Sequence, residues 1–576
     1  MAHKTIYKPS LKMWSGPQLV SPMFHENTTL GRAILFLLNL NPDNVCQISV
    51  DDGSQRTNKE IFDATLKIAY NLKKLGCRKE DIFSVICHNI HDLVPVMLAG
   101  FFLGIPVNMI DASFPKNEII HMYRLLNPTM VFCDDYVAKT VKEALNDVGS
   151  SARIFVLGRK LPNFSHITDL LDDEGVKSDI MKLYMNPPEV DKSCAAAILC
   201  SSGTTGMSKA VQISHESLMI ACVHPYMRCI FNSTDTAFSF TSFYWYGGYI
   251  YFLLCTFMNI PRLITTQAFS PELWIDIVTK YKVSFAFTSA AQTYQLVNSS
   301  LLKKDTMASI KRYSTTGAKL TSELSKAMRQ FLYNGYFHNG YGLCESGEIA
   351  SQTVDSAKES VGYLLPGMQA KIINENGRQM GVGESGELCV KTRKMFMGYY
   401  GNEMATREVL DDDGWIHTGD IAHFDEEGSL IFTTRKKEIF KHNGIAVSPA
   451  ELEQILEKHP DVIQAAVVGV PHPLYVDVPT ALVIRRAGSS VTEDELVKFV
   501  SSQVMVNKRL HGGVYFVDNL PMTLSGKIRK YKVRELATKF YNLKNSVSAT
   551  IRSYVYRERI YCEYSSVQGF KGIVRS

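Results

Sequence analysis

The 576-residue chain has no CxxC pair among its twelve cysteines and no strong excess of either charge. Cysteines scattered without such spacing indicate reduced core thiols of an intracellular protein, not a disulfide framework or a zinc site. A net charge of +5 is small for this length, so the body of the chain lacks the electrostatic signature of nucleic-acid binding. These absences leave a large globular protein, and its 45% hydrophobic content is enough for well-buried cores.

Neither end of the chain carries a recognisable targeting address. The stretch from Met1 to Lys8 lacks the apolar core of a secretory signal. The chain ends at Val574 to Ser576, which is not a Ser-Lys-Leu-type peroxisomal signal. A cytoplasmic location is therefore the default expectation, and a peroxisomal location is the alternative.

One uncharged and nearly all-apolar segment, residues 243–260, is about long enough to span a bilayer. Its tyrosines and paired glycines suit a packed helix or a pocket wall better than lipid, and no second span accompanies it. We therefore expect this segment to be buried inside the protein and expect no transmembrane segment.

The apolar run from Ala195 to Cys200 leads into a loop that is rich in hydroxyl groups and glycine. Glycines allow a tight turn that presents backbone N–H groups to an anion, and the hydroxyl groups and one ammonium add further donors. Two residues separate the two glycines, whereas a Walker loop has four and then a lysine. An ordinary polar turn could have this composition, but the loop predicts phosphate binding. Its members are Ser201, Ser202, Gly203, Thr204, Thr205, Gly206 and Lys209.

The order of strand and helix patterns predicts an α/β fold. Up to about residue 361, repeated β-α-β patterns predict two layered α/β halves with mostly parallel strands. Residues 362–433 alternate short strands with glycine turns, which predicts a small β-barrel-like subdomain. Together these parts would form an N-terminal domain of residues 1–436.

A smaller α+β domain is predicted for residues 437–535, and its mobility is implied only by the family resemblance given below. Its first helix should begin at Ser448, where an N-cap residue precedes a proline and a glutamate follows three residues later. A capping box at Thr492 predicts a second helix start. Residues 536–576 form a basic, tyrosine-rich tail, which we expect to be flexible or loosely docked, although a nucleic-acid or membrane-surface role would fit the same composition.

Four further blocks follow the phosphate loop: His338–Glu345, Trp415–Asp420, Arg435–Gly444 and Pro521–Lys527. With the loop, they make the chain resemble the adenylate-forming superfamily of acyl-CoA synthetases, firefly luciferase and coumarate-CoA ligases. The resemblance implies an enzyme that uses ATP to convert a carboxylate into an acyl-adenylate and then transfers the acyl group to a thiol, usually that of CoA. An ionised carboxylate needs no activated nucleophile, so such a site consists mainly of donors and cations that align anions.

The resemblance also implies roles for single residues. The phosphate loop would hold the β- and γ-phosphates of ATP, and Glu345 with Thr204 would help to hold Mg²⁺. Tyr341 would lie along the adenine, and Asp420 and Arg435 would bind the ribose. Further nucleotide contacts would be Gly317, Ala318, Gly340 and Gly342. Lys527 would be the adenylation lysine, which bridges the carboxylate and the α-phosphate.

The C-terminal domain of the family rotates between the two half-reactions, and Lys437 resembles its hinge position. In the second half-reaction Lys441 would come in as Lys527 withdraws, and a loop at Gly444 would flank a tunnel for the pantetheine arm. Taken singly, Lys527 could be a solvated loop lysine and Asp420 a turn aspartate. Their order in the chain favours the functional interpretation.

The chain departs from the family pattern where the acid is expected to bind. Trp245 stands where luciferases and many ligases carry a histidine, Cys344 replaces a usual threonine, and Thr316 replaces a glycine. A crowded aromatic mouth without an imidazole argues against luciferin oxidation. The predicted pocket residues are Tyr244, Trp245, Tyr246, Thr316, Cys344 and Ser346.

The sequence thus predicts an acid-thiol ligase that uses ATP, Mg²⁺ and CoA and activates a fatty or arylalkyl carboxylic acid, with a medium- or long-chain fatty acid favoured. The alternatives are a luciferase-like or other acyl-adenylate-forming enzyme and a non-catalytic nucleotide-binding relative. The expected partners are the carboxylic acid, ATP and CoA, with no nucleic acid and no obligate protein partner.

Overall fold

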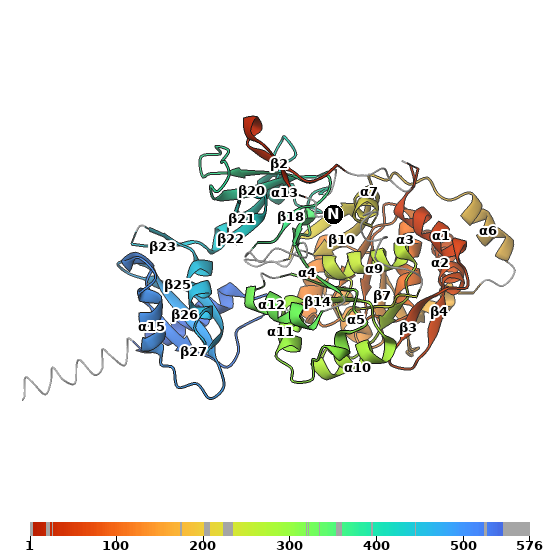
Figure 1. The fold of residues 1–576 in the computed structure, drawn as a ribbon. Coiled ribbons are helices and arrows are strands. Elements are labelled where there is room, and N and C mark those ends of the chain that lie inside the picture. The colour runs from red at the N-terminus through yellow and green to blue at the C-terminus, as the bar shows by residue number, and fades with distance from the viewer. Residues whose placement is uncertain are drawn as a thin grey trace, which may run out of the picture. The chain divides into compact units, whose positions relative to one another are not determined.

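The computed structural model describes residues 4–18, 24–25, 27–172, 176–200, 208–222, 234–317, 320, 322–332, 335–352, 360–392, 396–443, 445–522 and 527–544. The chain divides into two compact units. The first comprises residues 1–432 with 525–527, and the second comprises residues 433–524 with 528–576. Figure 1 labels the elements of both units along the chain.

A seven-stranded sheet of the first unit has the order β11-β10-β6-β5-β7-β8-β9. Every neighbouring pair is parallel except β10 and β11, which are antiparallel. Helices connect the successive strands, as the repeated β-α-β pattern predicts. The elements are β5 (Phe83–Ile86), α3 (Leu93–Leu103), β6 (Val107–Ile110), α4 (Lys116–Leu126), β7 (Met130–Asp134), α5 (Ala138–Asp147), β8 (Arg153–Leu157), β9 (Ser165–His166), α6 (Lys177–Met185), β10 (Ala195–Cys200) and β11 (Ala210–Ser214).

A nine-stranded sheet of the same unit has the order β18-β17-β16-β15-β14-β12-β13-β3-β4. Its middle strands, from β16 to β3, are parallel, and the strands at both ends are antiparallel to their neighbours. The strands are β3 (Val45–Ser49), β4 (Gln55–Thr57), β12 (Ala237–Phe238), β13 (Arg262–Ile264), β14 (Phe285–Ser289), β15 (Arg312–Thr316), β16 (Tyr336–Leu343), β17 (Gly347–Gln352) and β18 (Tyr363–Leu364).

Helices pack with these sheets around a shared apolar core. The capping box of α2 (Asn58–Lys74) forms as predicted, since Glu60 N donates to Thr57 Oγ1 at 3.2 Å and Thr57 N donates to Glu60 Oε2 at 2.7 Å. The apolar segment predicted to be buried forms α9 (Tyr246–Met258). No helix of the described residues is long and apolar enough to cross a membrane. The other helices are α1 (Leu30–Leu40), α7 (His215–Cys222), α10 (Pro271–Tyr281), α11 (Ala290–Val297) and α12 (Ser322–Phe331).

The small β subdomain is a six-stranded sheet in the order β1-β2-β19-β20-β21-β22. Two strands from the start of the chain belong to it, because β2 pairs with β19 and the ring of Trp14 stacks on Phe424 at 4.5 Å. The sequence had placed this subdomain only at residues 362–433. Its elements are β1 (Ile6–Lys8), β2 (Met13–Ser15), β19 (Gln369–Ile373), β20 (Gly386–Lys391), α13 (Glu403–Val409), β21 (Ile416–Phe424) and β22 (Leu430–Arg435).

The second unit is an α+β module. Its first helix begins at Pro449 as predicted, but the Ser448 side chain makes no cap hydrogen bond, so the expected N-cap interaction is absent. The capping box at Thr492 is formed. Residues 530–544 are helical, with Ala537 fully buried, and residues 545–576 of the predicted tail lie outside the described residues. The elements are β23 (Phe440–His442), β24 (Ile445–Val447), α14 (Pro449–Glu457), β25 (Val462–His472), β26 (Val476–Arg485), α15 (Glu493–Ser501) and β27 (Gly513–Phe516).

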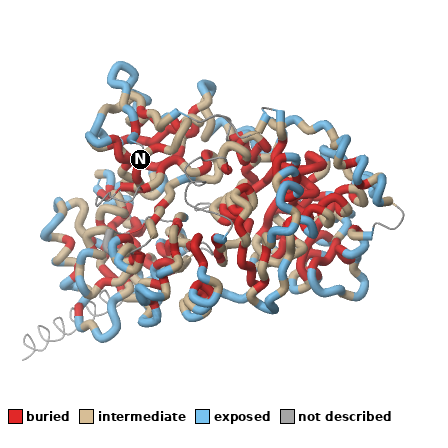
Figure 2. Tube along the Cα trace, turned by 45° about the vertical axis from the view of Figure 1, so that its right-hand side comes forward, coloured by how far each residue is buried: buried red, intermediate tan, exposed pale blue. Residues whose placement is uncertain are grey.

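Burial follows the layers of each unit. Figure 2 shows buried residues along the sheets and the inner faces of the helices, and exposed residues mainly in loops and outer turns. All eleven residues of α3 are buried, consistent with its nearly uniform apolar sequence.

Candidate functional site

Strands β10 and β11 form a hairpin whose connection is the predicted phosphate loop. Ser201, Ser202, Gly203, Thr204, Thr205 and Gly206 lie outside the described residues. Lys209 is described, and its Nζ lies 4.6 Å from the centre of the Tyr399 ring. Tyr399 Oη in turn donates a hydrogen bond to Glu345 Oε1 at 2.7 Å. Tyr399 therefore brings the lysine of the loop and the expected magnesium ligand into one cluster.

Tyr399 is a residue that the sequence analysis missed. A backbone bridge to Val211 places it beside β11, and Tyr400 N donates to Ala210 O at 2.8 Å. Burial, and secondly the charge of Glu345, raise the pKa of the Tyr399 hydroxyl, so the phenol keeps its proton and remains a donor. No motif marks this residue, because its partners are joined only by the fold.

Tyr341 and Asp420, two predicted nucleotide contacts, are joined by a hydrogen bond. Tyr341 Oη donates to Asp420 Oδ2 at 2.6 Å, and Asp420 on β21 is fully buried. A buried carboxylate is stable only when hydrogen bonds compensate for its lost hydration. Arg435 is the last residue of β22, and it precedes the short 3-10 turn Lys436–Glu438 that contains the predicted hinge residue Lys437.

At two positions of the predicted nucleotide site, the backbone geometry explains why the residue is glycine. Gly317 has a φ of +101°, which strongly favours glycine. A Cβ at Gly342 would lie 2.2 Å from the carbonyl oxygen of Gly347, across the β16–β17 hairpin. Ala318 lies outside the described residues.

Cys344 and Lys527 are described as parts of the first unit. Burial raises the pKa of the Cys344 thiol to about 12; the charge of Glu345 acts in the same direction and the charge of Lys527 opposes it. A thiol with such a pKa stays protonated near neutral pH, so Cys344 is no nucleophile. Lys441 is exposed on β23, and Gly444 lies outside the described residues.

An aromatic wall precedes α9. The rings of Tyr244 and Trp245 meet edge to face with centres 4.7 Å apart, and Tyr244 also contacts Phe114 at 4.9 Å. Trp245 is the N-cap residue of α9, and Ser242 Oγ donates to Asp111 Oδ2 at 2.6 Å just before it. The wall is therefore tied to the carboxyl end of β6.

The remaining predicted pocket residues lie around the start of α9 and the hairpin of β16 and β17. Thr316 Oγ1 donates to Gly340 O at 2.8 Å, and its methyl group lies beside Gly247, where an added Cβ would be 3.2 Å away. Ser346 is fully buried, and its hydroxyl donates to Gly347 O at 3.1 Å. Burial raises the pKa of the Tyr246 hydroxyl, so this phenol also stays protonated.

A second set of polar residues near the pocket was not assigned a role from the sequence. His338 Nε2 lies 2.9 Å from Glu348 Oε1. Both groups cover Gly340, where an added Cβ would lie 2.5 Å from Glu348 Oε1 and 3.3 Å from His338 Cε1. Gly340 thus makes room for this pair.

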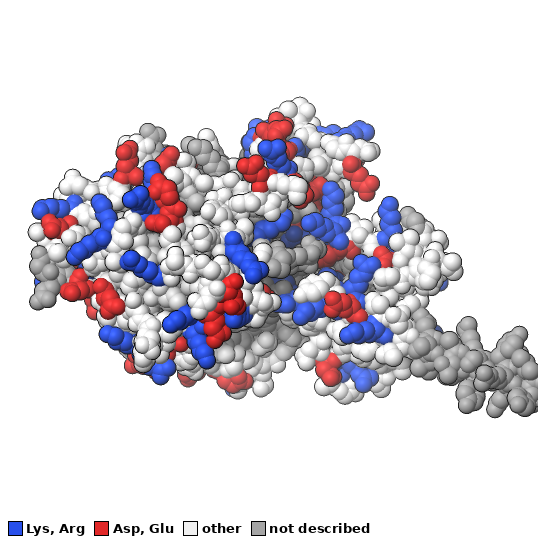
Figure 3. All heavy atoms as spheres, turned by 180° about the vertical axis from the view of Figure 1, so that it is seen from behind, with Lys and Arg blue, Asp and Glu red and all other residues white. Residues whose placement is uncertain are grey.

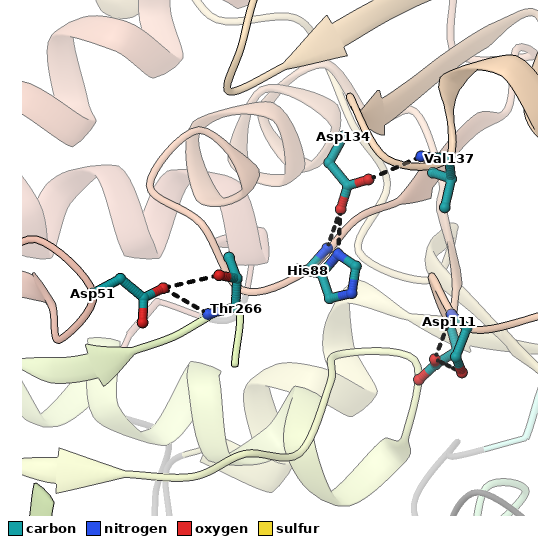
Figure 4. Close-up of polar contacts among 7 residues, drawn as sticks. Asp51, His88, Asp111, Asp134, Val137 and Thr266 are labelled. Atoms are coloured by element: carbon teal, nitrogen blue, oxygen red, sulfur yellow. Dashed lines mark hydrogen bonds and ion pairs between the residues drawn. The ribbon is translucent and has the colours of Figure 1, made fainter. Parts of the chain in front are cut away.

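The seven-stranded sheet carries a polar cluster at its carboxyl edge. Strands β6 and β7 flank β5 on opposite sides, so the strand order reverses there, and ligands of α/β sheets commonly bind at such a point. His88 Nδ1 lies 2.5 Å from Asp134 Oδ2, and Figure 4 shows the two side chains facing each other, with Asp111 on the neighbouring strand end. The hydrogen bond to Asp134 is the main cause that raises the pKa of His88, so its imidazolium form is favoured.

Figure 4 also shows hydrogen bonds between the segments that follow β3 and β13. Asp51 Oδ2 accepts hydrogen bonds from Thr266 N at 2.8 Å and Thr266 Oγ1 at 3.0 Å. These bonds lower the pKa of Asp51 against the opposing effect of burial, which is the largest single influence. Asp51 therefore connects the segments that follow β3 and β13.

Charge on the surface matches the small net charge of the chain. On the face shown in Figure 3, Lys and Arg side chains alternate with Asp and Glu side chains over the described residues.

Comparisons with known proteins agree along most of the chain. The model of the family described as AMP-binding enzyme matches residues 38–400, and that of the AMP-binding enzyme C-terminal domain matches residues 451–527. Luciferin 4-monooxygenase of Luciola mingrelica is 31% identical, with 84% of this chain and 90% of that protein covered. Probable 4-coumarate--CoA ligase 1 of Dictyostelium discoideum is 29% identical, with 87% and 94% covered. The crystal structure of ATP-bound MatB from Rhodopseudomonas palustris shares the fold, with a TM-score of 0.79, 22% identity, and 89% and 100% coverage.

Proposed function

Because this chain belongs to the family of AMP-binding, adenylate-forming enzymes, we propose that it is an acyl-CoA synthetase that activates a fatty or arylalkyl carboxylic acid and transfers it to CoA. One observation carries the proposal: Lys209, Tyr399 and Glu345 form a cluster at the end of the predicted phosphate loop, and Tyr341 bonds to Asp420 in the same unit. These side chains supply the cation, carboxylates and donors that an ATP site requires.

In the first half-reaction, an acid carboxylate oxygen attacks the α-phosphorus and pyrophosphate leaves. Lys209 and the hydroxyl groups of the loop would hold the leaving pyrophosphate, and Lys527 would bind the oxygens of the carboxylate and the α-phosphate. Asp420 would accept hydrogen bonds from the ribose, so Tyr341 would have to share that carboxylate with the sugar. The residues act by alignment and charge neutralisation, since the nucleophile is already an anion.

Magnesium fits the donor set of the cluster. A Mg²⁺ ion prefers oxygen ligands and is usually held by one or two carboxylates together with substrate phosphates. Glu345 would supply the carboxylate and Thr204 a hydroxyl, and Tyr399 would orient Glu345 through its hydrogen bond. When bound, Mg²⁺ stabilises charge that develops on the phosphate oxygens. The described residues contain no cluster of three or more His, Cys, Asp and Glu side chains suited to a metal, so such an ion would depend on the nucleotide.

The second half-reaction requires a thiol. Cys344 stays protonated and buried, so the acceptor is better supplied from outside, and CoA is the acceptor of the coumarate ligases that the chain resembles. Lys441 and Gly444 would serve this step after rotation about Lys437. A luciferase-like adenylate-forming enzyme is the second candidate, favoured by 31% identity to a luciferin 4-monooxygenase and disfavoured by Trp245 in place of histidine.

The test is pyrophosphate release from Mg-ATP with a panel of carboxylic acids, from acetic to long-chain fatty acids and phenylpropenoic acids, followed by AMP formation with and without CoA. The proposal expects acid-dependent pyrophosphate release and CoA-dependent turnover to a thioester. Pyrophosphate release without thioester would favour another adenylate-forming activity. If none of the acids in the panel led to pyrophosphate release, the enzymatic proposal would be contradicted.

A further inference from the structure

A small cavity lies beside the C-terminal half of α9, away from the aromatic wall. Residues of β3, β13, α1, α2, α3 and α9 line it, and its volume is about 20 Å³. A space of this size holds one water-sized particle, since about 10–15 Å³ suffices for one water molecule. Trp245 caps α9 at its start and Asn259 at its end, so the helical rise separates this cavity from the predicted acid pocket by about 10–20 Å.

Arg262 places a positive charge in the wall of the cavity without a carboxylate beside it. The residue is 4% exposed, and although burial lowers its pKa, a guanidinium stays protonated near neutral pH. The described part of the chain gives Arg262 no ion pair, and the groups that oppose the effect of burial are the thiols of Cys255 and Cys46 and the phenol of Tyr251. Burial raises the pKa of both thiols to about 12, so they are neutral at pH 7.

Most polar hydrogens of Arg262 and of its neighbour Gln47 lack an acceptor. Of the five N–H groups of a guanidinium, one at Nη2 donates to Gln47 Oε1 at 3.0 Å, and this is the only hydrogen bond that the described residues give to the side chain. Gln47 is 2% exposed, and its Nε2 has no partner among the described residues. Buried donors without a partner are costly, and both residues line the same cavity.

The aromatic rings near Arg262 balance its charge only in part. The guanidinium carbon lies 4.8 Å from the centre of the Phe252 ring and 5.3 Å from that of Phe243. A ring face attracts a cation but carries only partial negative charge. The positive end of α2 adds to the potential, because its first residue, Asn58, also lines the cavity. Glu60 at the same helix start is exposed and engaged in the capping box.

From these contacts we infer that the cavity binds a small monovalent anion such as chloride, held by the guanidinium of Arg262 and the amide N–H groups of Gln47. A water molecule would fill the space but leave the buried charge unbalanced, which is unfavourable. Phosphate and organic carboxylates are too large for a space that holds one water-sized particle. Cys46, Thr256 and Asn259 in the lining are half-buried and provide the side from which an ion enters.

The chloride dependence of stability tests this inference without any substrate, so the result does not depend on the proposed function. Thermal unfolding is followed by tryptophan fluorescence, which reports on the first unit because all four tryptophans belong to it. Sodium chloride is replaced stepwise by sodium gluconate at constant ionic strength, which keeps the screening of surface charges the same. We expect Tm to rise by about 2 °C for each tenfold increase in chloride, because a ligand that binds only the folded state stabilises it in proportion to the logarithm of its concentration.

Variants assign the effect to the cavity. Gln47→Glu places a carboxylate where the amide oxygen now accepts from Arg262, so an internal ion pair should replace the bound anion and abolish the chloride-dependent shift. Arg262→Met should abolish it by removing the cation. Arg407→Met is the control, since the Arg407 side chain on α13 is 83% exposed, and it should keep the wild-type dependence. If Arg262→Met does not fold, Gln47→Glu decides alone.

Two outcomes would overturn the inference. A wild-type Tm that is the same in chloride and gluconate would mean that the cavity holds water only. A chloride dependence that is undiminished in Gln47→Glu would mean that the ion binds elsewhere on the protein. Both outcomes would leave the proposed adenylate-forming activity untouched.

Discussion

Tyr399 shows how one side chain can connect two parts of a site that lie far apart in the sequence. Its ring faces the ammonium of Lys209, and its hydroxyl donates to Glu345. A carboxylate that accepts a hydrogen bond is held in one orientation, which favours binding of a metal ion at its other oxygen. Tyr399 is therefore a positioning residue for the proposed magnesium ligand.

Replacing Tyr399 with Phe removes the hydrogen bond and keeps the ring. We expect a lower rate of pyrophosphate release at limiting Mg²⁺, by about tenfold, since a hydrogen bond to a charged group contributes about 1.5 kcal/mol or more. The rate should recover in part at high Mg²⁺. Titration of the initial rate with Mg²⁺ measures both effects. The neighbouring Tyr400→Phe is the matched control, and equal Mg²⁺ dependence of the two variants would refute the assigned role.

Some residues of the candidate site can be predicted from sequence motifs, and others cannot. Asp420 and Tyr341 lie in short motifs, so the resemblance identifies both, and their hydrogen bond is consistent with neighbouring roles. Tyr399 and Glu348 lie outside any motif used in the sequence analysis. Their partners come from other segments of the chain, and contact between distant segments is fixed by the fold and not by local spacing.

At the scale of elements, the hairpin of β25 and β26 contains a strained residue. Val476 has a φ of +68°, a left-handed conformation that is unfavourable for a β-branched residue, and its side chain is 67% exposed. Exposure means that little packing would be lost if it were replaced. A substitution of Val476 can therefore relieve the backbone strain with little loss of packing.

Val476→Asn should stabilise the protein by about 1 kcal/mol, because asparagine adopts left-handed backbone conformations more easily than valine. Denaturant unfolding of the second unit, followed by circular dichroism, measures the change. Leu474→Asn is the control, since Leu474 is 80% exposed and is not among the described residues with positive φ. A similar gain for both variants would show that polarity, and not backbone strain, is responsible.

Long periodic elements were predictable, and short or distant ones were not. The helix Lys116–Leu126 and the strand Val107–Ile110 belong to the β-α-β order that the sequence predicts, because their patterns extend over whole elements. Strands β1 and β2 have three residues each, β1 pairs with β2, and β2 pairs with β19 more than 350 residues away, so no local pattern marks them. At Ser448 the sequence signature of a cap is present without the bond, which shows that composition alone does not determine the side-chain rotamer.

At the scale of the whole molecule, the two half-reactions should separate under mutation. Lys527→Ala should reduce acyl-adenylate formation by about 100-fold or more, as expected for loss of a group that stabilises transition-state charge. Transfer from a supplied acyl-adenylate to CoA should remain largely intact. Gly444→Trp should do the reverse by obstructing the thiol path. Single-turnover assays of each step measure both variants, and equal loss of both steps in Lys527→Ala would contradict the rotating-domain proposal.

Global stability should depend on a buried histidine. His215 is fully buried, and neither ring nitrogen has a hydrogen-bond partner among the described residues. Burial lowers the pKa of His215 from 6.5 to about 4, so the unfolded chain takes up a proton at a higher pH than the folded chain. Stability conferred by the neutral ring is present above pH 6.5 and is lost as the pH falls toward 4, by on the order of 3 kcal/mol.

His215→Leu should remove this part of the pH dependence. Urea unfolding at pH values between 7 and about 4 gives the free energy of unfolding for each protein. The difference between wild type and variant should change steadily over that interval. His25→Leu, at an exposed histidine, should follow the wild-type curve. A constant offset between wild type and His215→Leu at all pH values would show that His215 does not titrate in this range.

The place of Trp14 in the β subdomain has a consequence for synthesis. Its ring is fully buried against Phe424, and its strand pairs with β19. A ribosome that adds about 5–20 residues per second needs on the order of 20–80 seconds to reach Phe424 after Trp14 has been made. During this time an apolar strand is available to the wrong partners. Folding of this subdomain must therefore follow translation of most of the chain, although its first strand is among the first segments to leave the ribosome.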